Sequence, residues 1–186
     1  MAHALHPPPG IRRVLIEADE LAARVRELGG RLTADYADRE PVLVGVLTGA
    51  VVFFADLMRA IDVPLQCEFM GVSSYGTASR SSGIVKITAD LTVSIENRDV
   101  LVVEDIIDTG RTISYLRRNL ETRHPRSLRI CTLLDKIERR EVPIDLDYVG
   151  FTIPNEFVVG YGLDHAGLYR NLPYLAALDL GERAGA

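Results

Sequence analysis

The chain has 186 residues, the size of one domain with a substantial hydrophobic core. Hydrophobic residues make up 47% of it and charged residues 25%, and no apolar run is long enough to cross a bilayer, so we expect no membrane association. The formal charge of −5 and the absence of a basic stripe argue against a nucleic-acid-binding protein. Residues 1–12 contain no apolar export signal and are expected to form a flexible tail.

The two cysteines, Cys67 and Cys131, are far apart in the sequence, and each lies in an apolar run typical of a strand. They form neither a zinc-binding pattern nor a disulfide framework. We therefore expect both to be small buried residues in a protein of the reducing cytoplasm.

The first half of the chain alternates between helical and strand-like patterns. Apolar residues recur three and four apart over residues 17–36, which predicts a helix. Residues 41–47 are a Val-rich run typical of a strand buried on both faces, and helical periodicity follows as far as residue 61. Residues 65–72 indicate a second strand, and residues 73–83 are rich in Gly and Ser, which predicts a long mobile loop.

The second half continues the alternation, with a strand at residues 99–105, a helix ending before Pro125, and a strand at residues 127–135. Residues 147–153 and 157–162 are further candidate strands. This order predicts a three-layer α/β domain around a parallel sheet. The basic clusters RRNLETRHPRSLR and KIERR are expected to be a solvated helix face and a solvated turn.

Parallel sheets of this kind bind ligands at the carboxyl ends of their strands, and three unusual segments lie at such ends. They are Thr48-Gly49, residues 104–112, and Asp135-Lys136. This coincidence is the first indication of a binding site.

The segment VEDIIDTGRT combines two acids at a strand end with a turn before the next helix. Gly110 permits a positive φ there. The backbone N–H groups of the turn, with the hydroxyls of Thr109 and Thr112, form an anion-binding nest at a helix N-terminus. The turn is not a Walker loop, because the GxxxxGK[ST] pattern and its lysine are absent.

Carboxylates repel phosphate, so Glu104 and Asp105 must serve another part of the ligand. A sugar with vicinal hydroxyls and a 5-phosphate satisfies both halves of the segment: the acids accept hydrogen bonds from the diol, and the turn binds the phosphate. The acids also suit a hydrated Mg²⁺, which takes one or two carboxylates plus substrate oxygens. One alternative is an acid-capped helix start without a ligand. A phosphatase Asp-x-Asp pair fails on spacing, since two residues separate Asp105 from Asp108.

These motifs resemble those of a known family. VLVVEDIIDTGRT is similar to the signature of the type I phosphoribosyltransferases, which bind phosphoribosyl diphosphate. The segment LTGAVVFFADLMRAI resembles the diphosphate loop and helix of the bacterial-type hypoxanthine-guanine enzymes, SSYG their mobile lid, and LLDK their purine-contact lysine segment. Residues 149–178 resemble their purine-binding hood and tail, so the resemblance extends from about Pro41 to Leu178.

The resemblance implies the type I phosphoribosyltransferase fold: a three-layer parallel sheet in a single domain over residues 1–186, with a small hood from the N-terminal segment and about residues 150–186. It implies a purine-salvage enzyme that transfers the 5-phosphoribosyl group from phosphoribosyl diphosphate to hypoxanthine or guanine, with Mg²⁺ as cofactor. It further implies a cytoplasmic homodimer or homotetramer. The alternative is a regulatory protein of the same fold that binds nucleic acid, which the acidic charge disfavours.

By the same resemblance, Asp108 is the acid/base that acts at N7 of the purine, a role in which a carboxylate contributes roughly 10²–10⁴-fold. The alternative is that Asp108 merely caps the following helix. Lys136 would donate a hydrogen bond to O6 of the purine. Phe157 would stack on the purine face, and the backbone at Val158 would meet the ring edge.

Ser74 and Tyr75 would form a lid that excludes water from the reacting centre. Asp164 would hold a second Mg²⁺ through water and help to read the exocyclic position of the purine. Many family members carry a basic residue in place of Thr48, in a peptide that can be cis, so here the backbone amides and Mg²⁺ would bind more of the diphosphate charge. The residues implied to bind phosphoribosyl diphosphate are Thr48, Gly49, Glu104, Asp105, Asp108, Thr109, Gly110, Arg111, Thr112 and Arg170, and those implied to bind metal are Glu104, Asp105 and Asp164.

Overall fold

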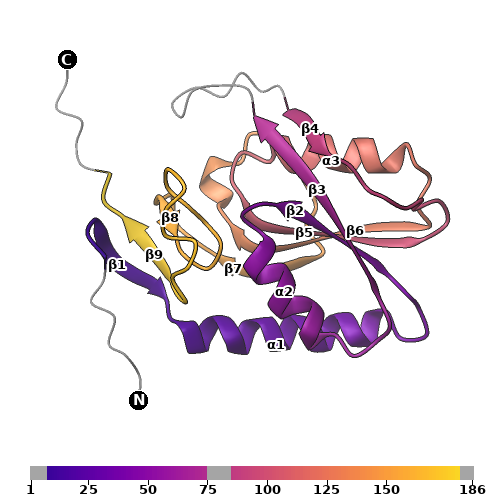
Figure 1. Cartoon of the computed structure of the whole chain (residues 1–186), viewed down its shortest axis with the longest axis horizontal. Coiled ribbons are helices and arrows are strands. Elements are labelled where there is room, and N and C mark those ends of the chain that lie inside the picture. Colours follow the sequence, from indigo (N-terminus) through magenta and orange to yellow (C-terminus); the bar gives the residue numbers. More distant parts are fainter. Residues whose placement is uncertain (1–7, 75–84, 181–186) are drawn as a thin grey trace.

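The computed structural model describes residues 8–74 and 85–180, which form two sheets and three α-helices (Figure 1). The larger sheet has six strands in the order β4-β3-β2-β5-β6-β7, and all of them are parallel except the edge strand β4. Its strands are β2 (Val42–Leu47), β3 (Gln66–Ser74), β4 (Val85–Ala89), β5 (Asp99–Ile107), β6 (Ser127–Asp135) and β7 (Tyr148–Thr152). The expected parallel sheet is confirmed.

Helices cover both faces of this sheet and give the three layers expected from the sequence (Figure 1). Helices α1 (Ala18–Asp35) and α2 (Val51–Ala60) pack on one face, and α3 (Arg111–Glu121) packs on the other. Successive residues of the buried strands point to opposite faces. In β5, Leu101 therefore joins the core under α1 and α2, while Val102 joins the core under α3.

A second, smaller sheet brings the two ends of the described chain together (Figure 1). Strands β1 (Ile11–Ile16), β9 (Leu175–Leu178) and β8 (Val158–Val159) pair antiparallel in the order β1-β9-β8. We take this sheet as the centre of the proposed hood. Ile11 and Arg12, which we expected in the flexible tail, belong to β1, where Ile11 pairs with Leu178 of β9.

Several expectations about local structure were wrong. Strand β5 continues two residues beyond the predicted end at residue 105, as far as Ile107, because its pairing with β6 continues that far. Ser73 and Ser74 close β3 by pairing with β4, whereas residues 75–83 of the predicted mobile loop lie outside the described residues.

The two cysteines also differ from each other. Cys131 is buried in β6, as expected, but Cys67 is exposed. The Sγ atom of Cys67 lies 3.6 Å from the Sδ atom of Met58 in α2. Cys67 is in the half of β3 that does not pair with the edge strand β4.

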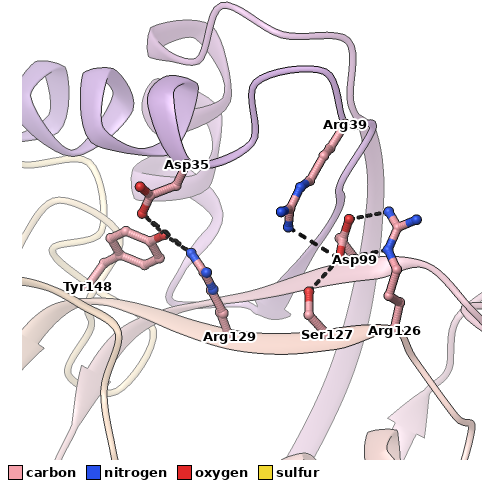
Figure 2. Close-up of polar contacts among 7 residues, drawn as sticks. All are labelled: Asp35, Arg39, Asp99, Arg126, Ser127, Arg129 and Tyr148. Atoms are coloured by element: carbon pink, nitrogen blue, oxygen red, sulfur yellow. Dashed lines mark hydrogen bonds and ion pairs between the residues drawn. The ribbon is translucent and has the colours of Figure 1, made fainter.

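Polar residues join α1 and the loop after it to the amino-terminal edge of the large sheet (Figure 2). Asp99, the first residue of β5, is only 1% exposed. It pairs with Arg126 and accepts a 2.6 Å hydrogen bond from the Ser127 hydroxyl, and Arg39 lies 3.9 Å away. The bonds from Arg126 hold the pKa of Asp99 below its usual range. The cluster therefore holds the start of β5 in place and favours the ionised form of the Asp99 carboxylate.

The other half of this cluster anchors the end of α1. The Tyr148 hydroxyl of β7 donates a 2.5 Å hydrogen bond to Asp35, and Arg129 lies 3.4 Å from the same carboxylate. Helix α1 is thus bound to β6 and β7 by side chains as well as by its apolar stripe. None of the helices in the described residues is long and apolar enough to span a membrane.

Asp99→Ala is expected to lower the free energy of unfolding by about 1–3 kcal/mol at pH 7, because charge-assisted hydrogen bonds of a buried carboxylate are lost. Since the folded pKa is lowered, this contribution is present above the unfolded pKa of about 3.9 and disappears as the pH falls through the lower folded value. Urea unfolding at pH 7 and at the lowest pH that the fold tolerates measures the difference. A destabilisation that does not shrink on acidification would contradict the role given to the ionised form.

Candidate active site

The site lies where the order of the large sheet reverses. From β2 the chain moves to its neighbour β3 on one side, whereas from β5 it moves to β6 on the other, so the carboxyl ends of β2 and β5 flank a topological switch point. A pocket of about 280 Å³ lies at this point. Seven residues predicted from the sequence line it: Thr48, Gly49, Glu104, Asp105, Thr112, Asp164 and Arg170.

A smaller pocket of about 90 Å³ adjoins the first and is formed by the turn after β5. Gly110 has φ of 82°, in the left-handed region that the sequence led us to expect, and α3 begins at the next residue. The hydroxyl of Thr109 accepts a 3.4 Å hydrogen bond from the N–H of Arg111. The predicted residues Glu104, Asp108, Thr109, Gly110 and Thr112 all line this pocket.

The alternative that Asp108 only caps α3 is wrong. The N-cap residue of α3 is Gly110, and no side chain caps this helix end. The Asp108 carboxylate lies instead 3.2 Å from the Nε atom of Arg139. Because it is not used by the helix, this carboxylate is available to the pocket.

The two acids of β5 lack the partners that buried carboxylates normally have. Glu104 is 8% exposed, and its Oε2 atom has no hydrogen-bond partner among the described residues. Burial, and then the neighbouring charge of Asp105, raise the pKa of Glu104 well above its usual value. Burial also raises the pKa of Asp105 to about 6, although its Oδ1 accepts a 2.8 Å hydrogen bond from the N–H of Ile106. Both carboxylates would be stabilised by a cation or by hydroxyl donors.

This environment fits a metal that takes part of its coordination from a substrate. Within residues 8–74 and 85–180, no group of three or more His, Cys, Asp or Glu side chains is arranged to hold a metal ion alone. The unpartnered Oε2 of Glu104 and the neighbouring Asp105 carboxylate are hard oxygen ligands of the kind that Mg²⁺ uses together with water and phosphate oxygens.

Close contacts of glycine residues join three distant segments at the pocket. The peptide between Leu47 and Thr48 is cis. A Cβ atom on Gly49 would overlap the carboxylate of Asp105, and one on Gly162 would overlap the carbonyl of Gly49. Gly162 also has a φ of 101°, which disfavours a side chain. The turn after β2 therefore lies directly between β5 and the 160–163 turn.

Arg170 is held in place by the segment that precedes it. Its guanidinium lies 2.6 Å from Asp164 and donates a 2.5 Å hydrogen bond to the carbonyl of Gly162. Asp164 in turn accepts a 2.8 Å hydrogen bond from the N–H of Gly167. These bonds keep a planar cation at the edge of the larger pocket, where a phosphate group can be bound by two donors.

The residues predicted to bind a purine are more dispersed. Lys136 directly follows β6 and is 7% exposed, and burial lowers its pKa although the charge of Asp108 opposes the shift. Phe157 is 39% exposed, with its ring edge-to-face to His165 at a centroid distance of 5.2 Å. Val158 is buried in β8. These three predicted residues line neither of the two pockets, and Tyr75 of the predicted lid lies outside the described residues.

Arg139 and Arg140 were not recognised as site residues from the sequence. We expected KIERR to be a solvated turn, but Arg139 pairs with Asp108, and Arg140 pairs with Asp135 and donates a 3.3 Å hydrogen bond to the carbonyl of Asp108. A local run of basic residues has the same composition in a solvated turn and in a site. Only the folded position of the carboxylates separates the two.

Known proteins are similar to this chain in both sequence and structure. The family described as phosphoribosyl transferase domain matches residues 15–166. A hypoxanthine-guanine phosphoribosyltransferase of Mycobacterium avium is 52% identical over 178 residues, which is 92% of this chain and 88% of that protein. A crystal structure of a hypoxanthine phosphoribosyltransferase from Staphylococcus aureus is similar with a TM-score of 0.87 and 47% identity, covering 91% of this chain and 92% of that one.

A bifunctional TilS/HprT protein of Listeria innocua is 56% identical over 168 residues, or 90% of this chain. The chain spans about a quarter of the length of that relative, because the match covers 26% of it.

Asp105→Asn is expected to raise the free energy of unfolding by about 1–3 kcal/mol at pH 8 in the presence of EDTA, because it removes a buried charge. The folded pKa of about 6 exceeds the unfolded value of about 3.9. Ionisation of the wild-type carboxyl group therefore destabilises the fold most above pH 6 and progressively less as the pH falls. The gain should therefore shrink by about half at pH 5. Urea unfolding of both proteins tests this, and a gain equal at the two pH values would exclude burial of the ionised form as its cause.

Proposed function

This chain belongs to the phosphoribosyltransferase family, and we propose that it transfers the 5-phosphoribosyl group of phosphoribosyl diphosphate to hypoxanthine or guanine, as an enzyme of purine salvage. One observation carries the proposal: two buried acids and an anion-binding turn meet at the switch point of a parallel sheet. The hypoxanthine-guanine enzymes among its relatives support the choice of purine.

The phosphoribosyl group would lie along the end of β5. The N–H groups at the start of α3 and the hydroxyls of Thr109 and Thr112 would bind the 5-phosphate, where the helix N-terminus favours negative charge. Glu104 and Asp105 would accept hydrogen bonds from the ribose hydroxyls, which supplies donors to the unpartnered Oε2 of Glu104. The pentose is thus bound at both ends by consecutive parts of one segment.

The diphosphate would occupy the larger pocket. Backbone amides of Thr48 and Gly49 would bind it on one side, and the guanidinium of Arg170 on the other. Mg²⁺ would be held by Glu104 and Asp105, with a second ion near Asp164, and when bound it would neutralise charge on the leaving diphosphate. Thr48 carries no charge, so the bound metal and Arg170 would supply the positive charge on this side.

The purine would lie between Asp108 and the small sheet. Lys136 would donate a hydrogen bond to O6, which is an acceptor in both hypoxanthine and guanine. The exposed ring of Phe157 would stack on the purine, and the backbone of Val158 would meet its edge. Ser74 and Tyr75 would close over the reacting atoms and exclude water, which otherwise hydrolyses the activated sugar.

In the chemical step, the N9 lone pair of the purine forms a bond to the anomeric carbon while the bond from that carbon to the diphosphate oxygen breaks. The N7 proton of the purine passes to the Asp108 carboxylate, which makes the base a better nucleophile as the bond forms. The electron pair of the broken bond leaves with diphosphate. Asp108 is suited to this role because it does not cap α3.

We also propose that the protein acts in the cytoplasm as a homodimer or homotetramer. Support comes from its membership of the phosphoribosyltransferase family. Light scattering of the purified protein measures the oligomeric state.

The proposed function predicts release of diphosphate from phosphoribosyl diphosphate when hypoxanthine or guanine is added. Adenine should give little turnover, because it carries a donor at position 6 where Lys136 needs an acceptor. An assay of hypoxanthine, guanine, xanthine and adenine, each with and without Mg²⁺, tests substrate class and metal together. Turnover with none of the oxopurines would refute the proposal.

Asp108→Asn is expected to preserve the fold and the affinity for phosphoribosyl diphosphate, while kcat falls at least about tenfold, since the amide cannot accept the N7 proton. Steady-state kinetics, with circular dichroism as the control for folding, measures the effect. Near-normal turnover would remove Asp108 from the acid/base role and leave the substrate assignment intact.

A further inference from the structure

The segment after β6 places three cations close to two carboxylates. Lys136 follows the strand, Arg139 is the last residue of the 3-10 helix Ile137–Arg139, and Arg140 follows it. Residues three apart in a 3-10 turn lie on the same side, so Lys136 and Arg139 both face the turn that carries Asp108. The N–H groups of residues 141 and 142 both donate 3.0 Å hydrogen bonds to the carbonyl of Thr109, which fixes this segment against that turn.

The cations differ in how they are paired. Arg140 is bound to Asp135, and the two side chains are 16% and 10% exposed. Arg139 lies 3.2 Å from Asp108, with side chains 47% and 39% exposed. Lys136 makes no ion pair with any described residue, although the charge of Asp108 acts on it. The ammonium group therefore keeps its donors free.

Without Arg139, Lys136 would be a cation open to the Asp108 carboxylate, since it has no ion pair of its own among the described residues and the charge of Asp108 already acts on it. Burial lowers the pKa of Lys136, so its charged form is poorly solvated and would gain from a carboxylate partner. That pairing would occupy the donor meant for the purine carbonyl and turn the carboxylate away from N7. The guanidinium of Arg139, which already lies 3.2 Å from the carboxylate, would compete with this pairing.

The other charged groups nearby do not replace Arg139. Arg111 is 2.5 Å from Glu141 across the start of α3, and Arg170 is paired with Asp164 at the far pocket. Glu104 lines the same small pocket as Asp108 and adds negative charge. Of the cations around Asp108, Arg139 alone forms an ion pair with its carboxylate in the described part of the chain.

We propose that Arg139 is a positioning residue that holds the Asp108 carboxylate apart from Lys136, so that the two groups meet separate atoms of the purine. This inference rests on the proposed function, because it assigns Lys136 and Asp108 to the base. It gives a role to the ion pair between the half-exposed Arg139 and the proposed acid/base Asp108.

Arg139→Gln, which keeps much of the length and removes the charge, should raise KM for hypoxanthine about threefold to fivefold, the range expected for a half-exposed ion pair. KM for phosphoribosyl diphosphate should stay unchanged, because the turn would bind the 5-phosphate through backbone N–H groups and Thr hydroxyls and not through the Asp108 carboxylate. Arg139→Lys should restore most of the loss. Arg117→Gln is the matched control, since Arg117 forms an ordinary surface pair with Glu121 on α3.

A double-mutant cycle separates positioning from a general structural effect. In the Asp108→Asn protein, Lys136 has no carboxylate to pair with. Adding Arg139→Gln should then leave the Kd for inosine monophosphate, measured by calorimetry, unchanged, whereas the same change in the wild-type background should weaken it about threefold to fivefold.

Three results would overturn the inference. These are an unchanged KM for hypoxanthine in Arg139→Gln, an equal loss of affinity in both backgrounds of the cycle, or a parallel rise in KM for phosphoribosyl diphosphate. A wild-type protein inactive with every oxopurine would overturn the proposed function itself. The two failures are distinguishable, because the first three are measured against a wild-type protein that turns over hypoxanthine.

Discussion

The buried acids Glu104 and Asp105 at the end of β5 are the constraint around which the site is arranged. The pairing of β5 with β6 continues past both residues, so the backbone fixes them in a strand and they cannot turn out to solvent as they would in a loop. Their proton affinities rise because burial disfavours the charged forms. A ligand that brings hydroxyls or a cation would relieve this, because it would supply partners that the fold leaves out.

The two ends of β5 show opposite electrostatics. At its amino end, Asp99 is satisfied by Arg126 and Ser127, and its pKa is lowered. Five residues later, Glu104 is similarly buried but has an oxygen without a partner, and its pKa is raised. The same strand therefore anchors the fold with one acid and leaves another without a full set of partners at the pocket. The difference lies in whether neighbouring side chains supply donors.

The sequence predicted the architecture because the buried strands and helices carry strong periodicity. The apolar stripe of α1 and the Val-rich run of β2 each had one plausible interpretation. The strands β1, β4 and β9 lie at a sheet edge or in the small sheet, and they were missed because their patterns are weak: β1 contains the adjacent charges Arg12 and Arg13, and β4 and β9 have only five and four residues. Their pairing depends on partners more than 150 residues away in the case of β1 and β9, which no local pattern encodes.

The sequence named residues that the structure brings to the two pockets, but it did not predict their environments. Turn chemistry pointed to Gly110, and its left-handed φ is present. The predicted strand ended at residue 105, and nothing local indicated that β5 would continue to Ile107, nor that Arg139 would reach Asp108, because both results depend on where β6 and its following turn lie. Sequence identifies which groups can do chemistry. The tertiary structure determines which of them remain unpaired, and therefore reactive.

The pocket lies at a contact between three segments that are distant in the sequence. The turn at Gly49, the carboxylate of Asp105 and the turn at Gly162 are in contact, yet they belong to different elements and to both sheets. A ligand that binds all three segments stabilises the contact between the small sheet and the large one, and by mass action it stabilises the folded state. Since burial disfavours the ionised forms of Glu104 and Asp105, a ligand that supplies a cation or hydroxyl donors to them would add to this stabilisation.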